Sequence, residues 1–520
     1  MRRIGIDVGG TNTDAVVIED GQVAVAVKAP TSEDVTSGIL DAFGRLKATG
    51  GLSGERIDAV MIGTTHFMNA VVQRRHLTKV GALRLGMPAS ASLPPFCDWP
   101  PDLARLVEGG VWMVEGGHEY DGRPFMPLNG ATVRQAARAM RAQGLRSVAI
   151  SAIFSPLDPS HEREAAAIVA QENPGAAITC SSDLGRIGLL ERENAGLLNA
   201  ALADLAHDTI AAFEAAIRGS GLDAPLFITQ NDGTVAEAAQ ARRLPVYSFA
   251  SGATNSMRGG AYLSGLDDAM VVDVGGTTTD IGQLRSGFPR EANSVVRIGG
   301  VRTLFRMPDL ISIGLGGGSH VTLEPLRIGP LSVGYRLPVE GIAFGGTQLT
   351  TSDVAIAAGL IGIGDRNRVA HLDPLIRARV LGEAKRMIEE SVDAVKTAAG
   401  DVALIAVGGG AFLVPDRLEG VARVIRVRHG DCANAVGAAI AQVSGEVDQV
   451  FRDLKRADAI ARASALAADR AVAAGADRAT LETVETEDIP IAYLPGNSIR
   501  VRVRVVGNVA ASTGALRQGR

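Results

Sequence analysis

A short motif occurs twice in this sequence, once at the start and once just past the middle. Residues 4–14 read Ile-Gly-Ile-Asp-Val-Gly-Gly-Thr-Asn-Thr-Asp, and residues 271–280 read Val-Val-Asp-Val-Gly-Gly-Thr-Thr-Thr-Asp. In each copy an apolar run leads into a glycine turn and a second apolar run follows, which is the pattern of a β-hairpin. No period of about 20–50 residues is present, which excludes a solenoid or a propeller. The duplication predicts two lobes that face each other.

The two copies agree at the positions that carry polar chemistry. Paired glycines let backbone N–H groups turn inward and form a nest for phosphate oxygens, and threonine hydroxyls add neutral donors. An aspartate at the end of a strand can hold Mg²⁺, usually through water. One copy alone would equally fit a structural turn, whereas two matching copies favour a phosphate site. The matched positions are Asp7 and Asp273, Gly9-Gly10 and Gly275-Gly276, Thr11 and Thr277, Thr13 and Thr279, and Asp14 and Asp280.

Elsewhere short β-rich runs alternate with helical patterns, which predicts α/β lobes. We expect strands at residues 22–27, 59–62, 148–154, 226–229, 246–250, 269–274 and 402–407. We expect helices at residues 35–48, 131–143, 160–171, 253–265, 352–360 and 380–398, and a longer one at 191–217 that breaks near its middle.

These patterns predict three parts of the chain. An N-terminal lobe spans residues 1–250 and carries a Pro- and Gly-rich insertion at about 85–130, which either lines a substrate entrance or is a plain surface insertion. The second lobe spans residues 251–446. Residues 447–520 form a small C-terminal part with a helix at 452–474 and strands at 489–493 and 498–506.

Glycine is in excess, at 62 of 520 residues, and two further clusters of it stand out. Gly408–Gly410 follow an apolar strand, a context that suits close backbone approach to a flat ligand such as adenosine. Gly316–Gly318 lie in Ile-Gly-Leu-Gly-Gly-Gly-Ser, shortly after the second hairpin motif. The absence of a Gly-Lys dipeptide excludes a Walker A loop, and the last glycine of a dinucleotide fingerprint is missing.

Charge and cysteine usage exclude several classes of protein. The net charge of −5 and a pI near 6.0 provide no basic field for nucleic acid or an anionic membrane. Cys97, Cys180 and Cys432 lie far apart, which argues for reduced thiols and against a disulfide framework or a zinc site. The first residues meet a charge too early for a signal peptide, and no apolar run approaches the ~18 residues that span a bilayer. We therefore expect a soluble, cytoplasmic protein.

The motifs and their order resemble those of the acetate/sugar kinase, heat-shock chaperone and actin superfamily. More narrowly, the chain resembles the ATP-dependent hydantoinase/oxoprolinase A-type subunits. This resemblance implies an α/β, two-lobed, actin-like or sugar-kinase-like ATPase fold with duplicated lobes and a nucleotide cleft between them. It runs from the N-terminus to about residue 445, and it is carried by residues 5–16, Gly63-Thr64-Thr65, Asn69-Ala70, residues 230–233, Ser251-Gly252, and residues 273–282, 313–319 and 408–411.

The resemblance also implies a reaction, its cofactors and the roles of single residues. ATP with Mg²⁺ would phosphorylate the carbonyl oxygen of a lactam or imide, such as a hydantoin or a 5-oxoproline-like ring, and water would open the ring to give ADP, phosphate and an acid. Asp7 and Asp273 are expected to hold Mg²⁺ and to be catalytic. Asp232, in Thr-Gln-Asn-Asp-Gly, is either a third catalytic residue that orients substrate or water, or an ordinary Asp-Gly turn. The nucleotide is expected to contact Gly9, Gly10, Thr11, Asn12, Thr13, Gly275, Gly276, Thr277, Thr278, Gly316, Gly317, Gly318, Gly408, Gly409 and Gly410.

Two alternative functions stay open at this point. The chain could be a small-molecule kinase that releases a stable phosphorylated product, or an ATP-driven activator subunit of a larger complex. The family commonly works with a separate B-type subunit, so the resemblance implies such a partner and a lactam- or hydantoin-like substrate. We also expect an oligomeric assembly, and the charge argues against nucleic acid and membrane as partners.

Overall fold

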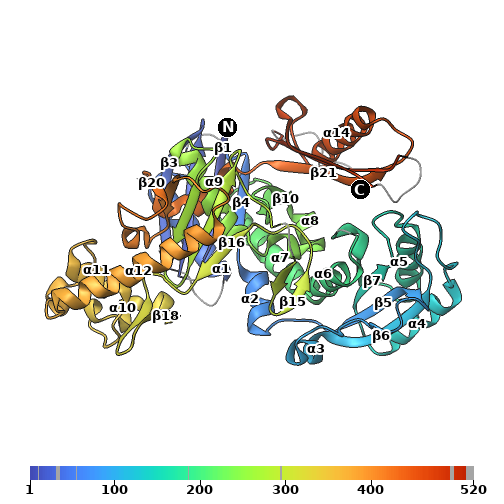
Figure 1. Cartoon of the computed structure of the whole chain (residues 1–520), viewed down its shortest axis with the longest axis horizontal. Coiled ribbons are helices and arrows are strands. Elements are labelled where there is room, and N and C mark those ends of the chain that lie inside the picture. The colour runs from blue at the N-terminus through green and yellow to red at the C-terminus, as the bar shows by residue number, and fades with distance from the viewer. Residues whose placement is uncertain are drawn as a thin grey trace.

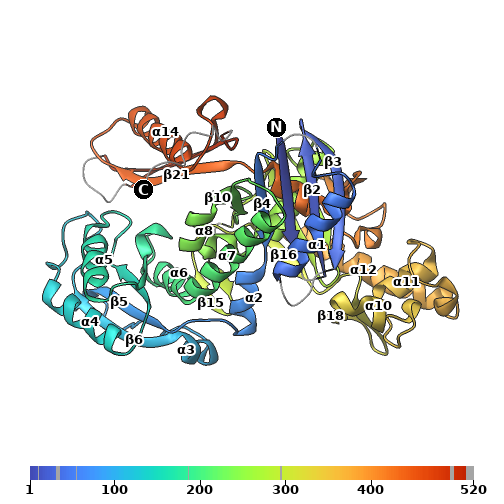
Figure 2. The same cartoon turned by 180° about the vertical axis from the view of Figure 1, so that it is seen from behind.

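The computed structural model describes residues 1–9, 11–30, 35–53, 56–185, 187–292, 295–491 and 497–510 (Figures 1 and 2). Two mixed β-sheets form its frame, and each is built around one of the two predicted hairpins. The first sheet has the order β22-β23-β21-β10-β9-β4-β1-β2-β3. Its strands are β1 (Arg2–Val8), β2 (Asn12–Glu19), β3 (Gln22–Pro30), β4 (Ala59–Thr64), β9 (Leu226–Thr229), β10 (Val235–Glu237), β21 (Val443–Phe451), β22 (Glu482–Pro490) and β23 (Ile499–Gly507).

The second sheet repeats the hairpin and the parallel neighbour of the first. Strand β1 pairs antiparallel with β2 and parallel with β4, just as β11 pairs antiparallel with β12 and parallel with β19. The order is β13-β12-β11-β19-β20, with β16 paired to β12. Its strands are β11 (Met270–Val274), β12 (Thr279–Arg285), β13 (Phe288–Pro289), β16 (Leu310–Ile313), β19 (Val402–Val407) and β20 (Val421–Arg426).

Two helices, α9 (Ser251–Ser264) and α13 (Ala433–Ile440), pack against each other between the sheets. Apolar side chains of α13 pack on the first sheet, and those of α9 pack on the second. A Cβ at Gly259 would clash with the Ala433 backbone, and one at Gly437 would clash with the backbone of Asn255, so glycine sets how closely the helices approach. The outer faces are covered by α1 (Val35–Ala48) and α7 (Ala203–Gly219) on the first sheet and by α12 (Pro374–Val395) on the second. The predicted two-lobed α/β fold with duplicated lobes is confirmed.

The segment after α2 (His66–Gln73) is more ordered than the predicted insertion. It forms a four-stranded, all-parallel sheet in the order β6-β5-β7-β8. Its strands are β5 (Val80–Met87), β6 (Glu108–Glu115), β7 (Ser147–Ala152) and β8 (Ala177–Cys180), and its helices are α3 (Pro101–Val107), α4 (Gly130–Ala142), α5 (Ser160–Glu172) and α6 (Leu189–Ala201). The sequence does not reveal β5 because Arg84 interrupts its apolar run; this arginine is buried and its Nε donates to Glu193 at 2.7 Å.

Strand β21 pairs with β10 and carries the C-terminal part of the chain into the first sheet. Helix α14 (Arg456–Ala473) packs on these strands through alanines spaced four residues apart. In Figures 1 and 2 this part and the parallel sheet of residues 80–180 lie on the same side of the first lobe, one above the other.

Most predicted elements are present, although many bounds differ by a few residues; one predicted strand is absent and another is displaced. The helix predicted at 191–217 is broken into α6 and α7, as expected. Residues 246–250 are not a strand, because Pro245 begins a 3₁₀ turn at Pro245–Ser248 and cannot donate to a ladder. The strand predicted at 489–493 is β22, which begins earlier and ends at Pro490. Among the described residues, no helix combines the length and apolarity needed to cross a membrane.

Candidate active site

The two hairpins present matching polar groups. Across β1 and β2 the register pairs Asp7 with Asp14, and across β11 and β12 it pairs Asp273 with Asp280. The turns also match, because the Gly9 N–H donates to the Asn12 carbonyl at 3.1 Å and the Gly275 N–H donates to the Thr278 carbonyl at 2.9 Å. The equivalence predicted from the repeated motif therefore holds in the backbone.

A cavity of about 190 Å³ lies between these hairpins and the N-terminal end of α9. Of the predicted nucleotide contacts, Thr13 lies buried within β2, Gly410 and Gly316–Gly318 are not on the cavity wall, and Gly10 lies outside the described residues. The predicted site residues that line the cavity are Asp7, Gly9, Thr11, Asn12, Asp273, Gly275, Gly276, Thr277, Thr278, Gly408 and Gly409.

Two glycines show why the motif needs residues without side chains. A Cβ at Gly276 would lie 2.5 Å from the Thr11 hydroxyl, so the turns of the two hairpins touch. Gly408 has φ +86°, and a Cβ there would clash with the Asp273 carboxylate. Gly409 has open space beside it and lines the cavity. The backbone at these positions is therefore close to, or part of, the cavity wall.

Gly316–Gly318 support the second hairpin turn from outside the cavity. The N–H groups of Gly317 and Gly318 donate to the carbonyls of Gly275 and Gly276 at 3.0 and 2.7 Å. A Cβ at Gly316 would lie 2.6 Å from the Thr277 nitrogen. These backbone contacts from Gly316–Gly318 hold the Gly275-Gly276 turn of the second hairpin in position.

Asp7 and Asp273 face the cavity as carboxylates that are costly to ionise. Burial, with Asp14 nearby, raises the pKa of Asp7 to about 6. Burial, with Asp280 and Asp7 nearby, raises the pKa of Asp273 to about 7. Asp7 Oδ2 accepts a hydrogen bond from Asn434 at 2.9 Å, and Oδ1 accepts one from Asn255 at 3.4 Å. Such a concentration of carboxylates favours a cation in the cavity.

Several lining residues were missed by the sequence reasoning. Lys28 Nζ lies 2.9 Å from Asp14 Oδ1 and donates to the Asp431 carbonyl at 2.6 Å. The β2–β3 register pairs Asp14 with Lys28, so counting along the strands from the Asp20-Gly21 turn would have brought Lys28 close to this position. Ser256 and Asn434 come from α9 and α13, whose crossing no local pattern reveals.

Asp232 lies away from this cavity, in a network of buried ion pairs. Burial alone would raise the pKa of Asp232, but Arg306 at 2.8 Å and Arg504 at 3.3 Å lower it to about 2. Its Oδ1 also accepts hydrogen bonds from the Thr234 N–H and hydroxyl, at 3.0 and 2.6 Å, just before the tight turn at Gly233. A carboxylate with such a pKa is a weak proton acceptor at neutral pH. Asp232 lines a second, larger cavity instead.

Comparison with protein families gives two adjacent matches. The model described as the hydantoinase/oxoprolinase N-terminal region matches residues 3–173, and the hydantoinase/oxoprolinase model matches residues 192–365. Together they cover both hairpins and strands β5, β6 and β7 of the parallel sheet, whereas β8 lies between the two matches.

Curated relatives are similar over much of this chain. The caprolactamase subunit alpha of Pseudomonas jessenii is 28% identical over 394 residues, which are 70% of this chain and 55% of that protein. The acetone carboxylase beta subunit of Xanthobacter autotrophicus is 26% identical over 439 residues, which are 76% of this chain and 58% of that protein. The chain thus spans about half the length of the curated relatives it matches.

Two solved structures share the fold. The ATP-dependent caprolactamase from Pseudomonas jessenii superposes with a TM-score of 0.78 at 21% identity, over 98% of this chain and 88% of that one. The nucleotide-free acetone carboxylase superposes with a TM-score of 0.71 at 18% identity, over 98% of this chain and 89% of that one. The likeness therefore extends over both lobes and the C-terminal part.

Proposed function

Because this chain belongs to the hydantoinase/oxoprolinase family, we propose that it is an ATP-dependent enzyme, or the ATPase subunit of one, that phosphorylates a cyclic amide to drive ring opening. The observation that carries the proposal is the cavity between the two hairpins, where paired turns meet the buried carboxylate of Asp7 and the half-buried carboxylate of Asp273. The names of two relatives, both subunits of amide-opening or carboxylating enzymes, support a role in such chemistry.

The residues that line the cavity suit the phosphates of a nucleoside triphosphate. Backbone N–H groups and threonine hydroxyls at the two turns would bind phosphate oxygens, and Gly409, which has open space beside it, would face the adenosine. Phosphoryl transfer relies mainly on positioning and charge neutralisation, which such turns provide. Lys28 would add a positive charge beside Asp14.

Mg²⁺ fits the donor set of the cavity. Among the residues that the structure describes, no group of three Asp, Glu, His or Cys side chains converges on one point. Mg²⁺ is usually held by one or two carboxylates together with phosphates and water, which is what Asp7 and Asp273 offer. When bound, the ion would neutralise charge on the phosphates. Asn434 and Asn255 would keep the Asp7 carboxylate oriented toward the cavity.

The chemistry follows from the weakness of an amide as an electrophile. The carbonyl oxygen of the ring attacks the γ-phosphorus of ATP, its new P–O bond forms as the bond to the ADP oxygen breaks, and an O-phosphorylated imidate results. Water adds to this carbon, and the C–N bond of the adduct breaks as its nitrogen takes up a proton, which leaves an acyl phosphate. A second water releases phosphate from it and gives the ring-opened acid. The relatives named as subunits support a further proposal, that a B-type partner subunit completes the turnover.

One assay distinguishes this function from its alternatives. The purified protein is incubated with Mg·ATP and a panel of lactams, hydantoins and polyols, and both free phosphate and phosphorylated product are followed. We expect phosphate to rise only with a cyclic amide. A stable phosphorylated product would instead indicate a small-molecule kinase, and hydrolysis that depends on another protein but on no small molecule would indicate an activator subunit.

A further inference from the structure

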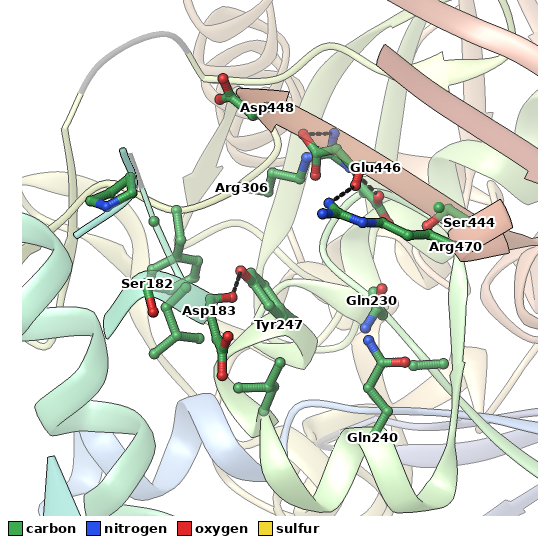
Figure 3. A pocket seen from close by; sticks show the side chains of 18 of the residues that line it. Ser182, Asp183, Gln230, Gln240, Tyr247, Arg306, Ser444, Glu446, Asp448 and Arg470 are labelled. Carbon is green, nitrogen blue, oxygen red and sulfur yellow. Dashed lines mark hydrogen bonds and ion pairs between the residues drawn. The ribbon is translucent and has the colours of Figure 1, made fainter. Parts of the chain in front are cut away.

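The larger cavity, of about 1100 Å³, is a separate space from the one between the hairpins (Figure 3). Figure 3 shows Tyr247 and Gln230 on one side of it and Glu446 and Arg470 on the other. None of its described lining residues lines the cavity between the hairpins. A residue that contacts the phosphoryl group during its transfer therefore belongs to the wall of the smaller cavity.

Part of the wall of that smaller cavity comes from outside the duplicated motif. Thr65, Gly252 and Ala253 line it, and they lie just after β4 and at the start of α9. Neither segment contains a copy of the hairpin motif. The phosphate contacts assigned to the two turns thus leave the role of Thr65 open.

The duplication shows which residue of the second lobe corresponds to Thr65. Thr65 follows β4 and Gly409 follows β19, and both residues line the cavity. In each lobe, the strand register pairs the aspartate of the motif with the residue two positions before the one on the wall. The pairs are Asp7 with Gly63 across β1 and β4, and Asp273 with Val407 across β11 and β19. Thr65 therefore holds in the first lobe the position that Gly409 holds in the second.

The two equivalent positions lie on opposite lobes, each beside the carboxylate of its own lobe. A Cβ at Gly252 would lie 3.4 Å from Thr65 Cγ2 and 4.0 Å from Asp7 Oδ1, so Thr65 and Asp7 flank the same glycine. In the second lobe, a Cβ at Gly408 would clash with the Asp273 carboxylate. With the adenosine on the second lobe, as proposed above, Thr65 faces the phosphates from the first lobe.

The Thr65 hydroxyl is held in place, and its proton is available. Its Oγ1 accepts a hydrogen bond from Asn69 Nδ2 at 3.3 Å, and its carbonyl accepts one from the Asn69 N–H at 2.9 Å. The preceding Thr64 is tied to α9, because its N–H donates to Ser251 Oγ at 3.3 Å and its carbonyl accepts from that hydroxyl at 3.0 Å. Within the part of the chain that the structure describes, the Thr65 hydroxyl donates to no acceptor.

We propose that the Thr65 hydroxyl binds the terminal phosphoryl group of the nucleotide and holds it for attack by the amide oxygen. This assignment rests on the proposed function, because it needs a nucleotide between the hairpins. The attacking and leaving oxygens lie roughly in line, so the amide oxygen approaches from the side away from the adenosine, which is the side of Thr65. The hydroxyl keeps its proton while the bond from the amide oxygen to phosphorus forms and the bond to the ADP oxygen breaks.

The phosphoryl oxygens, and not the amide oxygen, are the acceptors that suit this donor. A hydrogen bond to the attacking amide oxygen would draw on the lone pair that forms the new bond. A hydrogen bond to a phosphoryl oxygen fixes the group without that cost, and positioning is the main contribution of a protein to phosphoryl transfer. Thr65 is thus a catalytic residue that lies outside the duplicated motif.

The test compares the affinities for Mg·AMPPNP and Mg·ADP, which differ in the terminal phosphoryl group, by calorimetry on the full chain. Thr65→Val removes the hydroxyl and keeps the shape of the side chain. It should weaken Mg·AMPPNP binding by about ten-fold and change Mg·ADP binding by less than about two-fold. Thr65→Ser keeps the hydroxyl and should restore most of the lost affinity. Thr322→Val, at an exposed threonine of β17 (Ser319–Leu323), should change neither affinity.

The outcomes separate this assignment from the proposed function. A wild-type protein that binds neither nucleotide contradicts the proposed function, and the role of Thr65 fails with it. If the wild type binds both, a loss in Thr65→Val that is as large for Mg·ADP as for Mg·AMPPNP, or no loss for either, overturns the role of Thr65 alone. Thr65→Ala, whose smaller side chain cannot crowd the cavity, must show the same selective loss, and it takes the place of Thr65→Val if that variant does not fold.

Discussion

Asp7 shows how a residue of the proposed active site lowers the stability of the fold. Its pKa is raised from about 4 to about 6 by burial and by Asp14, so the native state binds more protons than the unfolded state between those pH values. The free energy of unfolding should therefore fall as the pH rises from 4 to 7. Asp7→Asn should reduce this dependence, leaving the part that comes from Asp273, and should stabilise the protein at pH 8 by on the order of 2 kcal/mol. Urea unfolding at pH 5 and pH 8 measures the effect.

The matched control for Asp7→Asn is Asp223→Asn, an exposed aspartate outside both cavities. The control should leave both the stability and its pH dependence unchanged. A destabilised Asp7→Asn protein at pH 8 would show that the carboxylate is held by favourable contacts that outweigh its burial.

Lys28 provides a second test at the same scale. It is the basic residue beside Asp14, and the ion pair outweighs burial and raises the pKa of Lys28 to about 12, so it stays charged. Lys28→Met should weaken Mg·ATP binding by about ten-fold, because Asp14 is left unpaired near the phosphates. Lys28→Arg should restore part of the affinity, and Lys47→Met, in the exposed last turn of α1, should have no effect. Unchanged ATP affinity in Lys28→Met would remove Lys28 from the site.

At the scale of elements, the crossing of α9 and α13 places Ser256 and Asn434 beside the cavity. Gly437→Ala would force its Cβ into the Asn255 backbone, so we expect a loss of about 3 kcal/mol or more in unfolding free energy, together with weaker ATP binding. Gly382→Ala in α12 is the control, because open space surrounds that exposed helical glycine. It should stabilise the protein by about 0.5–1 kcal/mol. Thermal unfolding of both variants measures the difference, and equal effects would contradict this packing argument.

The sequence predicted elements better than it predicted their contacts. Both hairpins, the alternation of strands and helices, and the position of Gly408–Gly410 directly after a strand could be read from local patterns. The strand β5 could not, because its buried arginine is stabilised by Glu193, a residue distant in the sequence. Asn434 and the partners of Asp232 are likewise set by packing between distant segments, which a single sequence does not encode locally.

At the scale of the whole molecule, the hairpins of both lobes border one cavity. A nucleotide held by both hairpins would link the lobes and stabilise only the native state. Saturating Mg·AMPPNP, at about 100 times its dissociation constant, should therefore raise the free energy of unfolding by about 2.7 kcal/mol. Chemical unfolding with and without the nucleotide measures this gain. If the same concentration of Mg·AMPPNP stabilised the Asp273→Asn variant by the same amount, the nucleotide would bind elsewhere.

The most direct measurement is the affinity for Mg·ATP of the wild-type protein and of the Asp7→Asn and Asp273→Asn variants, by isothermal titration calorimetry at pH 7.5. We expect the wild type to bind one Mg·ATP per chain and each substitution to weaken binding by at least about ten-fold, with circular dichroism unchanged. A wild-type protein that binds no Mg·ATP, or two folded variants that bind it as tightly as the wild type, would contradict a nucleotide site between the duplicated hairpins.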